Sequence, residues 1–326
     1  GNLEETLASI KLSKDIMPKE ADKINHGPTL VIHGEALLAG HEILKKGGSS
    51  IDAVEASVRV MEDCPFFNAG KGSVFTIGGK NELEASIMLG IDSHTAGACT
   101  LLSTVKNPIT LAKTLLQDPE NPHVFLGGIE AEKYAKSKGL EMVDPGYFWT
   151  KMRWKQHLDG LEEKKPENLR MLNDLDAGDS RDAADPNPMG TVGAVAIDIN
   201  GIISTATSTG GFNNKKDGRI GDTPLIACGT WADNETCGVS GTGNGEFFIR
   251  YSVAYDVAAR MKYLEESVQD AASYVINHLE KVGGIGGLIA LDKYGNFAMP
   301  FNTDGMFRGY IRVSEAVPYA YIFNDE

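Results

Sequence analysis

PMGTVGAVAIDINGIISTATSTGG, residues 188–211, is the stretch that decides the fold. It holds two runs rich in β-branched and small residues, one beginning at Thr191 and one beginning at Ile202, with Asn200-Gly201 between them. Asn-Gly between two such runs is a strong signal for a β-hairpin. The stretch therefore predicts two antiparallel strands, of which Thr191 opens the first.

The composition changes sharply just before this hairpin. Residues 161–188 are charged, contain no aromatic residue and are poor in β-branched residues, a composition typical of a mobile linker. We therefore expect one folded unit in two halves: residues 1–190, which end in this acidic linker, and residues 191–326.

The first half predicts short strands that alternate with helices. The apolar run Thr29–His33 is typical of a strand. A helix capped by Ser49 or Ser50 is expected to carry one apolar stripe, formed by Ile51, Val54, Val58 and Met61. Another helix is expected to begin near Pro108, whose ring suits the first helical turn.

The second half predicts a helical pair between strands. Apolar residues recur at helical spacing over Phe247–Met261 and over Val268–Leu279. The segment Gly287–Phe301 is typical of a second hairpin, with its turn at Tyr294-Gly295-Asn296. Strands on both sides of a helical pair favour a layered α/β sandwich.

The chain has 326 residues and a formal net charge of −14. This charge disfavours nucleic acid and anionic membranes as partners, so a small polar substrate fits better. No apolar run is long enough to span a bilayer, and the first residues, GNLEETLASI, lack the basic and apolar segments of a signal peptide. We therefore expect no membrane partner and a cytoplasmic location.

Four cysteines, Cys64, Cys99, Cys228 and Cys237, are too few and too scattered for a disulfide framework or a zinc knuckle. We expect reduced thiols. Cys228 and Cys237 are close enough in sequence to bridge in a secreted protein, and Asn234-Glu235-Thr236 matches a glycosylation sequon. Without a signal peptide, neither pattern carries weight.

A threonine that follows a linker and opens a strand can become a nucleophile. Cutting before Thr191 would give this residue a free α-amine, with a pKa of about 7.7 to 8.0, that can act as general base for its own hydroxyl. Gly190 has no side chain, so the peptide before Thr191 can take a strained conformation and admit attack by the hydroxyl. Gly-Thr at the start of a strand is structural in most proteins, so the surrounding motifs decide the interpretation.

Three glycine-rich and threonine-rich motifs follow in order: Thr205-Ala-Thr-Ser-Thr-Gly-Gly, Gly218-Arg-Ile-Gly-Asp-Thr-Pro and Ser240-Gly-Thr-Gly-Asn-Gly-Glu. Together with Pro188-Met-Gly-Thr-Val-Gly-Ala-Val, they resemble the plant-type asparaginase and isoaspartyl peptidase family of N-terminal-nucleophile hydrolases. The resemblance runs from about Thr29 onward and includes Gly47-Gly-Ser-Ser-Ile-Asp-Ala-Val, Phe67-Asn-Ala-Gly-Lys-Gly-Ser-Val, Gly286-Gly-Leu-Ile and Met299-Pro-Phe-Asn-Thr-Asp-Gly-Met.

The resemblance implies an α+β fold, a four-layer αββα sandwich. It also implies a precursor that splits between Gly190 and Thr191 into α and β subunits and assembles as an (αβ)₂ dimer. The implied activity is hydrolysis of L-asparagine or β-aspartyl dipeptides with release of L-aspartate, and the chemistry needs no cofactor. Thr191 matches the nucleophile of the family, and Thr209 matches the threonine that supports its hydroxyl and amine.

The resemblance also assigns the substrate site. Arg219 and Asp222 match the pair that holds the α-carboxylate and the α-amine of the substrate, and arginine can hold a carboxylate bidentately. Without the neighbouring motifs, an ion pair in a glycine-rich turn is the simpler interpretation of these two residues. Thr242 and Gly243 match the pair that stabilises the oxyanion, and Gly245 lies in the same substrate loop. A phosphate cradle is excluded here, because the lysine and the serine or threonine of a P-loop are missing.

Met61-Glu-Asp-Cys-Pro-Phe-Phe-Asn-Ala-Gly-Lys resembles the sodium-binding loop of the family, in which mostly backbone carbonyls surround the ion. The resemblance implies that Asn68 projects toward the active site and binds substrate. It implies a structural sodium ion held by Met61, Glu62, Cys64, Phe67, Ala69 and Lys71. A turn that ends a helix is the alternative interpretation of the same residues.

The sequence departs from the family in two places. Family members usually carry a His-Gly-Gly segment after the first strand, whereas here His33-Gly34 is followed by Glu35. This change removes backbone freedom and adds a charge near the loop linked to maturation, so we expect slow or incomplete self-cleavage. The usual pattern also carries aspartates at the positions of Glu84 and Leu89.

Three other functions stay open. A glycosylasparaginase uses similar chemistry on a glycan-linked asparagine, but it belongs to a secretory or lysosomal compartment. A threonine endopeptidase that acts on whole proteins fits less well, because Arg219 and Asp222 suit a free amino-acid head group. The third is a dimeric binding protein that keeps the fold without maturing, and the intact Thr191, Thr209 and Thr242 argue against it.

Overall fold

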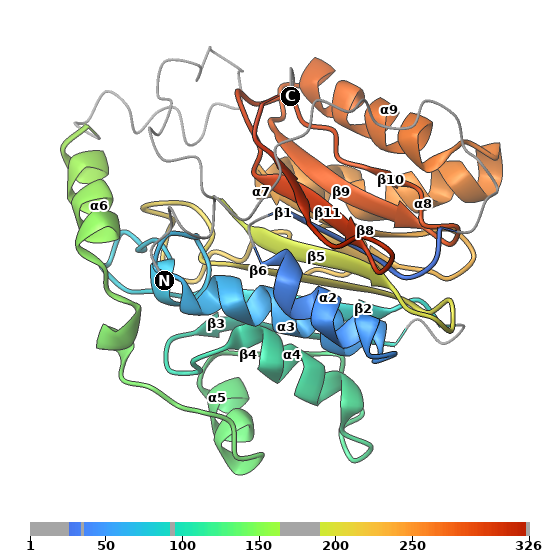
Figure 1. Ribbon diagram of the computed structural model, residues 1–326. Helices are drawn as coiled ribbons and strands as arrows, with labels where there is room; N and C mark the ends of the chain where they lie inside the picture. Colours follow the sequence, from blue (N-terminus) through green and yellow to red (C-terminus); the bar gives the residue numbers. More distant parts are fainter. Residues whose placement is uncertain (1–25, 34–35, 92–94, 164–189, 324–326) are drawn as a thin grey trace.

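The computed structural model of the chain describes residues 26–33, 36–91, 95–163 and 190–323 (Figure 1). Over these residues the larger sheet has the strand order β12-β11-β1-β5-β6-β2-β3-β4. Its strands are β1 (Thr29–His33), β2 (Leu83–Leu89), β3 (Ala96–Leu102), β4 (Phe125–Gly127), β5 (Val192–Ile197), β6 (Ile203–Thr209), β11 (Arg308–Arg312) and β12 (Tyr319–Tyr321). The smaller sheet has the order β10-β9-β8-β7, formed by β10 (Phe297–Ala298), β9 (Gly286–Asp292), β8 (Cys237–Gly243) and β7 (Thr230–Ala232).

Helices cover one face of each sheet (Figure 1). The larger sheet is covered by α2 (Leu37–Lys45), α3 (Ser50–Asp63), α4 (Pro108–Gln117) and α5 (Gly128–Ser137). The smaller sheet is covered by α8 (Val253–Leu264) and α9 (Val268–Lys281), and the short α7 (Gly245–Tyr251) leads into α8. The remaining helical segments are η1 (Gly70–Gly72), η2 (Pro145–Phe148) and α6 (Lys151–Glu163).

Buried apolar side chains form three groups, one in each space between neighbouring layers. The first lies between the larger sheet and its helices, and the second lies between the smaller sheet and α8 and α9. The third lies between the two sheets, where Val31 and Val195 of the larger sheet belong to the same cluster as Ile289 and Leu291 of the smaller one. The two sheets are thus held together by a core of their own.

The β5–β6 hairpin predicted from the sequence is confirmed, and it occupies the middle of the larger sheet. Its antiparallel register places Val192 opposite Ser208. The same register brings Thr191 beside Thr209 at the open end of the hairpin. At the closed end, Gly201 has a φ of 75°, which glycine adopts without the steric cost of a side chain.

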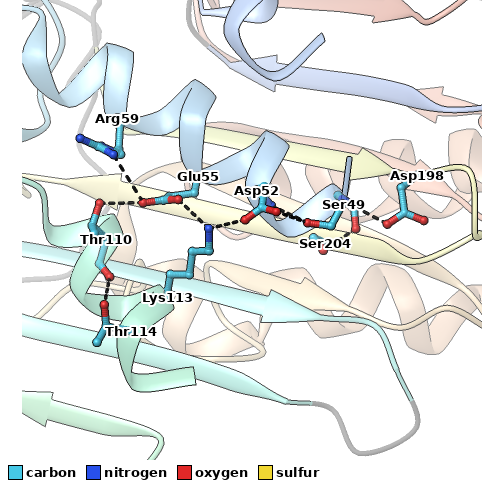
Figure 2. Close-up of polar contacts among 10 residues, drawn as sticks. Ser49, Asp52, Glu55, Arg59, Thr110, Lys113, Thr114, Asp198 and Ser204 are labelled. Carbon is cyan, nitrogen blue, oxygen red and sulfur yellow. Dashed lines mark hydrogen bonds and ion pairs between the residues drawn. The ribbon is translucent and has the colours of Figure 1, made fainter. Parts of the chain in front are cut away.

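The N-terminus of α3 is fixed to its neighbours by polar side chains (Figure 2). The Ser49 hydroxyl accepts the N–H of Asp52 at 3.3 Å, so Ser49 is the cap of the helix. Asp198, in the turn of the β5–β6 hairpin, accepts the N–H of Ser50 at 2.9 Å. Lys113 of α4 forms an ion pair with Asp52. The helix layer is thereby joined to the central hairpin.

Several further sequence predictions are confirmed. The strand at Thr29–His33, the helix that begins at Pro108 and the second hairpin, formed by β9 and β10, are all present. The four cysteines are free thiols. Within the part of the chain that the structure describes, no helix is both long enough and apolar enough to cross a membrane.

Two predicted boundaries were wrong. The single helix expected over Phe247–Met261 is broken at Ser252, whose left-handed backbone (φ 48°, ψ 48°) separates α7 from α8. Apolar spacing continues across this break, so the pattern alone could not place it. Helix α6 extends to Glu163, so residues 161–163 of the predicted linker are helical. The rest of that linker lies outside the described residues.

Candidate active site

Thr191 and Thr209 face each other at the open end of the β5–β6 hairpin. The Thr191 hydroxyl donates a hydrogen bond to the Thr209 hydroxyl at 3.1 Å, and the N–H of Gly211 donates to the same Thr209 oxygen at 3.0 Å. Thr209 is buried and Thr191 is half-buried. The direction of the Thr191 hydroxyl is therefore set by a neighbour that cannot itself move freely.

The end of β8 lies next to the peptide that precedes Thr191. Thr242 is half-buried, and Gly243, the last residue of this strand, is exposed. A Cβ on Gly190 would lie 3.3 Å from the Thr242 hydroxyl oxygen. The smaller sheet thus brings a hydroxyl donor to the Gly190–Thr191 bond, although the larger sheet carries Thr191 itself.

Arg219 is held from two directions. Its Nε and Nη2 atoms each donate a hydrogen bond to the Glu246 carboxylate at 3.0 Å. The guanidinium carbon lies 4.3 Å from the centre of the Phe212 ring, a cation–π contact. Glu246 thus engages the Nε and Nη2 edge of the guanidinium, and Nη1 lies on the opposite edge, beside Gly211 and Gly221.

Asp222 is buried beside Arg219, and two glycines make room for the pair. A Cβ on Gly245 would lie 2.6 Å from Asp222 Oδ1 and 2.7 Å from Arg219 Nη2. A Cβ on Gly221 would lie 2.7 Å from Arg219 Nη1. Burial and the negative charge of Glu84 together raise the pKa of the Asp222 carboxyl to about 7, although Arg219 opposes the shift.

These groups together suit one kind of ligand. Arg219 can hold a carboxylate, ionised Asp222 can hold an ammonium group, and the hydroxyl of Thr191, the predicted nucleophile, lies just before β5. A free amino acid carries both charges on one carbon. The arrangement can therefore fix an amino-acid head group while its side chain reaches Thr191.

Comparison with known proteins identifies the family of the chain. The profile of the asparaginase family matches residues 14–320 of the chain. The chain belongs to the asparaginase family. This membership confirms the resemblance drawn from the glycine-rich and threonine-rich motifs.

Individual relatives in the asparaginase family match most of the chain. The isoaspartyl peptidase of Escherichia coli (strain K12) is 43% identical over 272 residues, which make up 83% of this chain and 81% of that protein. The isoaspartyl peptidase/L-asparaginase of Mus musculus is 39% identical over 274 residues, 83% of this chain and 78% of that protein. The protein of the same name from Danio rerio is 38% identical over 277 residues, 82% of this chain and 81% of that protein.

The loop that resembles the sodium site of the asparaginase family folds back on the end of α3. Gly70 has a φ of 50°, and a Cβ there would lie 2.3 Å from the carbonyl oxygen of Glu62. Buried Arg153 of α6 donates to the carbonyls of Gly72 at 2.7 Å and Phe66 at 3.2 Å. Both carbonyls lie outside the predicted ligand set, and their bonds to Arg153 join this loop to α6.

Glu62 can contribute only its backbone to this loop. Its carboxyl accepts hydrogen bonds from the Ser208 hydroxyl at 2.6 Å and from the N–H of Ile109 at 3.0 Å, so the side chain reaches β6 and α4. Burial raises the pKa of the Glu62 carboxyl to about 8. Among the described residues, no group of three or more His, Cys, Asp or Glu could hold a metal ion. A cation at this loop would therefore depend on carbonyl oxygens.

Asn68 connects the same loop to the turn that follows Thr209. Its side-chain nitrogen donates to the carbonyl of Gly211 at 2.7 Å, and its side-chain oxygen accepts the N–H of Val74 at 3.0 Å. The N–H of Gly210 donates to its backbone carbonyl at 3.0 Å. Asn68 thus positions the backbone that follows Thr209, and its direct contact with substrate stays a prediction.

Sequence reasoning missed several residues that the structure brings to this site. Glu246 directly follows Gly245 in the quoted motif, which was the available signal for its contact with Arg219. Phe212 and the buried Lys215 lie in the segment between Thr209 and Arg219, where only the glycines stood out. The departure at residues 34–35 lies outside the described residues.

Proposed function

We propose that this chain is a threonine amidohydrolase that releases L-aspartate from L-asparagine and from β-aspartyl dipeptides. The observation that carries the proposal is the hydrogen bond of 3.1 Å between the Thr191 and Thr209 hydroxyls, at a predicted cleavage site in a member of the asparaginase family. The names of the relatives, isoaspartyl peptidase and L-asparaginase, support the same two substrates.

Maturation is the first reaction in this proposal. The Thr191 hydroxyl oxygen attacks the carbonyl carbon of Gly190, and the C–N bond breaks. The nitrogen keeps its own hydrogen and takes up the hydroxyl proton, and so becomes the new α-amine. The chain is then joined by an ester between the two residues. Water hydrolyses the ester and leaves a carboxylate on Gly190 and a free hydroxyl on Thr191. The Thr242 hydroxyl beside Gly190 supports this step as a donor to the oxyanion.

Hydrolysis of substrate repeats the same chemistry with a new base. The α-amine of Thr191 takes the hydroxyl proton while the oxygen attacks the side-chain amide carbon of the substrate. Thr242 and Gly243 stabilise the oxyanion, and the proton passes to the leaving ammonia or amino acid. Water then cleaves the aspartyl ester and regenerates the hydroxyl. The Thr209 hydroxyl holds the nucleophile in place throughout.

The head group of the substrate is held at the other end of the site. Arg219 binds the α-carboxylate through Nη1, since Glu246 occupies its Nε and Nη2 edge. Ionised Asp222 binds the α-ammonium group, and Gly245 gives both side chains the room to reach it. Asn68 is proposed to contribute to substrate binding from the opposite loop.

The higher levels of structure belong to the same proposal. The two sheets with helices on their outer faces are the four-layer αββα sandwich of N-terminal-nucleophile hydrolases. The precursor assembles as a homodimer, which matures to (αβ)₂. Four free thiols suit the reducing cytoplasm, which we propose as the compartment.

A structural sodium ion is proposed at the loop from Met61 to Lys71, held by the carbonyls of the predicted ligand set. The tight turn at Gly70, which packs against the Glu62 carbonyl, supports this assignment. Sodium chloride should raise the melting temperature by about 5 °C over choline chloride at equal ionic strength, because an ion that binds only the folded state stabilises it. Equal melting temperatures in the two salts would remove the ion from the proposal.

The central experiment joins mass spectrometry to two assays. The purified chain is incubated, its fragments are weighed, and hydrolysis of L-asparagine and of β-aspartyl-leucine is measured as cutting proceeds. Fragments that end at Gly190 and begin at Thr191, with both activities proportional to the cut fraction, are expected. A chain that binds L-aspartate without ever cutting would instead be a binding protein, and hydrolysis confined to a glycan-linked asparagine would indicate a glycosylasparaginase.

A further inference from the structure

A row of polar side chains crosses the larger sheet and begins at the nucleophile. Thr191 donates to Thr209, and Thr209 is paired with Glu84 on the next strand, β2. Residues directly opposite each other in an antiparallel pair project from the same face of the sheet. Glu84, only 1% exposed, therefore shares the face on which Thr209 meets Thr191.

The pairing of β2 with β3 is irregular at Glu84, where the row of polar side chains ends. The register between β2 and β3 shifts between Leu83 and Ala85, so the β3 segment opposite Glu84 carries an extra residue. Leu101, in that segment, has a φ of 55°. Such bulges re-aim a neighbouring side chain. The Thr100 hydroxyl donates to the Glu84 carboxylate at 3.3 Å.

The Glu84 carboxylate reaches the loop that carries the head-group residues. The N–H of Gly221 donates to its two oxygens at 3.1 and 3.2 Å. A Cβ on Gly221 would lie 2.6 Å from Glu84 Oε1 and 2.7 Å from Arg219 Nη1. The carboxylate and the guanidinium thus both pack against the residue that precedes Asp222.

Buried charges of opposite sign surround this contact. Burial raises the pKa of Glu84, while Lys215 and Arg219 favour its ionised form. Lys215 is itself buried and donates to the carbonyl of Glu82 at 2.7 Å. Because Glu84 is buried, water does not compete for the hydrogen bond from Gly221, which therefore ties this loop to β2.

We propose that Glu84 is a positioning residue that anchors the loop from Arg219 to Asp222 to the strand beside the nucleophile, and so keeps the two head-group side chains in place for binding. This inference rests on the proposed function, because it assigns the head group to that loop. Glu84 touches no reacting atom and acts through Gly221.

The test measures binding of L-aspartate by calorimetry and the kinetics of L-asparagine hydrolysis in matured enzyme. Glu84→Leu removes the acceptor, so it should weaken L-aspartate binding and raise KM at least tenfold while kcat changes less than threefold. Glu84→Gln keeps a carbonyl acceptor at the same reach, so both values should stay within about threefold of wild type. Equal tenfold losses in both variants would assign the effect to charge and overturn the anchoring role.

A second variant breaks the same contact from its other side and serves even where Glu84→Leu fails to fold. Gly221→Ala places a methyl group between Glu84 and Arg219, and it should weaken L-aspartate binding by a similar factor. If the two residues act through one contact, the double variant should bind L-aspartate no more weakly than the single variant with the lower affinity. Additive losses would overturn the proposal.

Two controls separate this inference from the proposed function. Glu82 is half-buried, and its carboxylate accepts the N–H of Gly218, just before the same loop, at 2.8 Å. Glu82→Gln should change L-aspartate binding less than twofold. Arg219→Leu tests the head-group assignment itself. Unchanged L-aspartate binding in Arg219→Leu would contradict that assignment. Weaker binding in Arg219→Leu together with unchanged binding in Glu84→Leu would contradict only the anchoring role.

Discussion

The two ends of the site are built from different chemistry. At the end proposed to hold the nucleophile, here called the nucleophile end, the side chains offer neutral hydroxyls: Thr209 and Thr242 lie on strands of the two sheets, and Thr191 directly precedes β5. At the head-group end, Arg219 and Asp222 are ionisable and largely buried, and their partners are charged as well. One end depends on strand register, and the other depends on the balance of buried charges.

This difference predicts which kinetic constant a substitution at each end should change. Hydroxyls that touch the reacting carbon act on the transition state, so changes there should lower kcat. Charged groups that hold the head group act on substrate and transition state alike, so changes there should raise KM. Variants at the nucleophile end should therefore mainly lower kcat, and variants at the head-group end should mainly raise KM.

The largest effect is expected at Thr191. Thr191→Ala should stay at full length and hydrolyse nothing measurable, because it lacks both the hydroxyl that attacks Gly190 and the one that attacks substrate. Thr191→Ser keeps a hydroxyl and should still cut, at a lower rate since the methyl group that helps to position it is gone. Mass spectrometry and an ammonia-release assay measure the two reactions. Hydrolysis by uncut Thr191→Ala would place the nucleophile elsewhere.

The next effect is expected at Arg219. Arg219→Leu should lower kcat/KM for L-asparagine by about 10²–10³-fold, mostly through KM, because the cation proposed to hold the α-carboxylate is lost and its own side chain is only 14% exposed. Self-cleavage should be retained, since that reaction has no free head group to hold.

A matched arginine lies far from the site. Arg260 makes a bidentate pair with Glu266 and lies over the Tyr274 ring, as Arg219 pairs with Glu246 and lies over an aromatic ring. Arg260→Leu should leave KM within twofold of wild type. A similar rise of KM in both variants would reduce Arg219 to a structural residue.

The third effect is a dependence on pH. Asp222 must be ionised to hold the ammonium group, and burial raises its pKa to about 7. The charges that act on it are those of Glu84, Arg219 and Glu246, and Cys228 also lies within range. The Thr191 amine must also lose its proton, with a reference pKa of about 7.7 to 8.0. Below pH 7, log kcat/KM should therefore approach a slope of two.

Asp222→Asn should remove one of these two ionisations. The acid limb of its kcat/KM profile should have a slope of one, at a lower overall level. Since the pKa of Asp222 is higher in the folded chain than in the unfolded chain, the folded state binds more protons between about pH 4 and pH 7, and wild-type stability should fall as pH rises through that window. An unchanged slope in Asp222→Asn would contradict the role of this carboxylate.

The hairpin at the nucleophile end could be predicted from the sequence alone. The Asn200-Gly201 turn fixes the register of the hairpin, and that register brings Thr191 beside Thr209. The roles of Thr209 and Thr242 came only from the resemblance, because no local pattern joins Thr242 of β8 to this hairpin, and these roles stay predictions.

The head-group end could be predicted only in part. The motifs pointed to Arg219 and Asp222, but the anchor at Glu84 arises from a strand pairing and a bulge that leave no periodic trace. Glu246 was likewise hidden, since a carboxylate in the first turn of a helix is common for electrostatic reasons alone. Long-range charge contacts are decided by packing, which composition and spacing do not encode.

The smallest effect is expected at Phe212, whose ring packs against Arg219 at the head-group end. The Phe212 ring lies 4.3 Å from the Arg219 guanidinium carbon, and a partly exposed cation–π contact contributes about 0.5–1 kcal/mol. Phe212→Leu keeps an apolar side chain and removes the ring, so KM should rise by about two- to fivefold at constant kcat. Tyr274→Leu removes the ring over Arg260 and should leave KM unchanged. If Phe212→Leu instead lowered kcat alone, the ring would act on the reacting end, and the division between the two ends would fail at this residue.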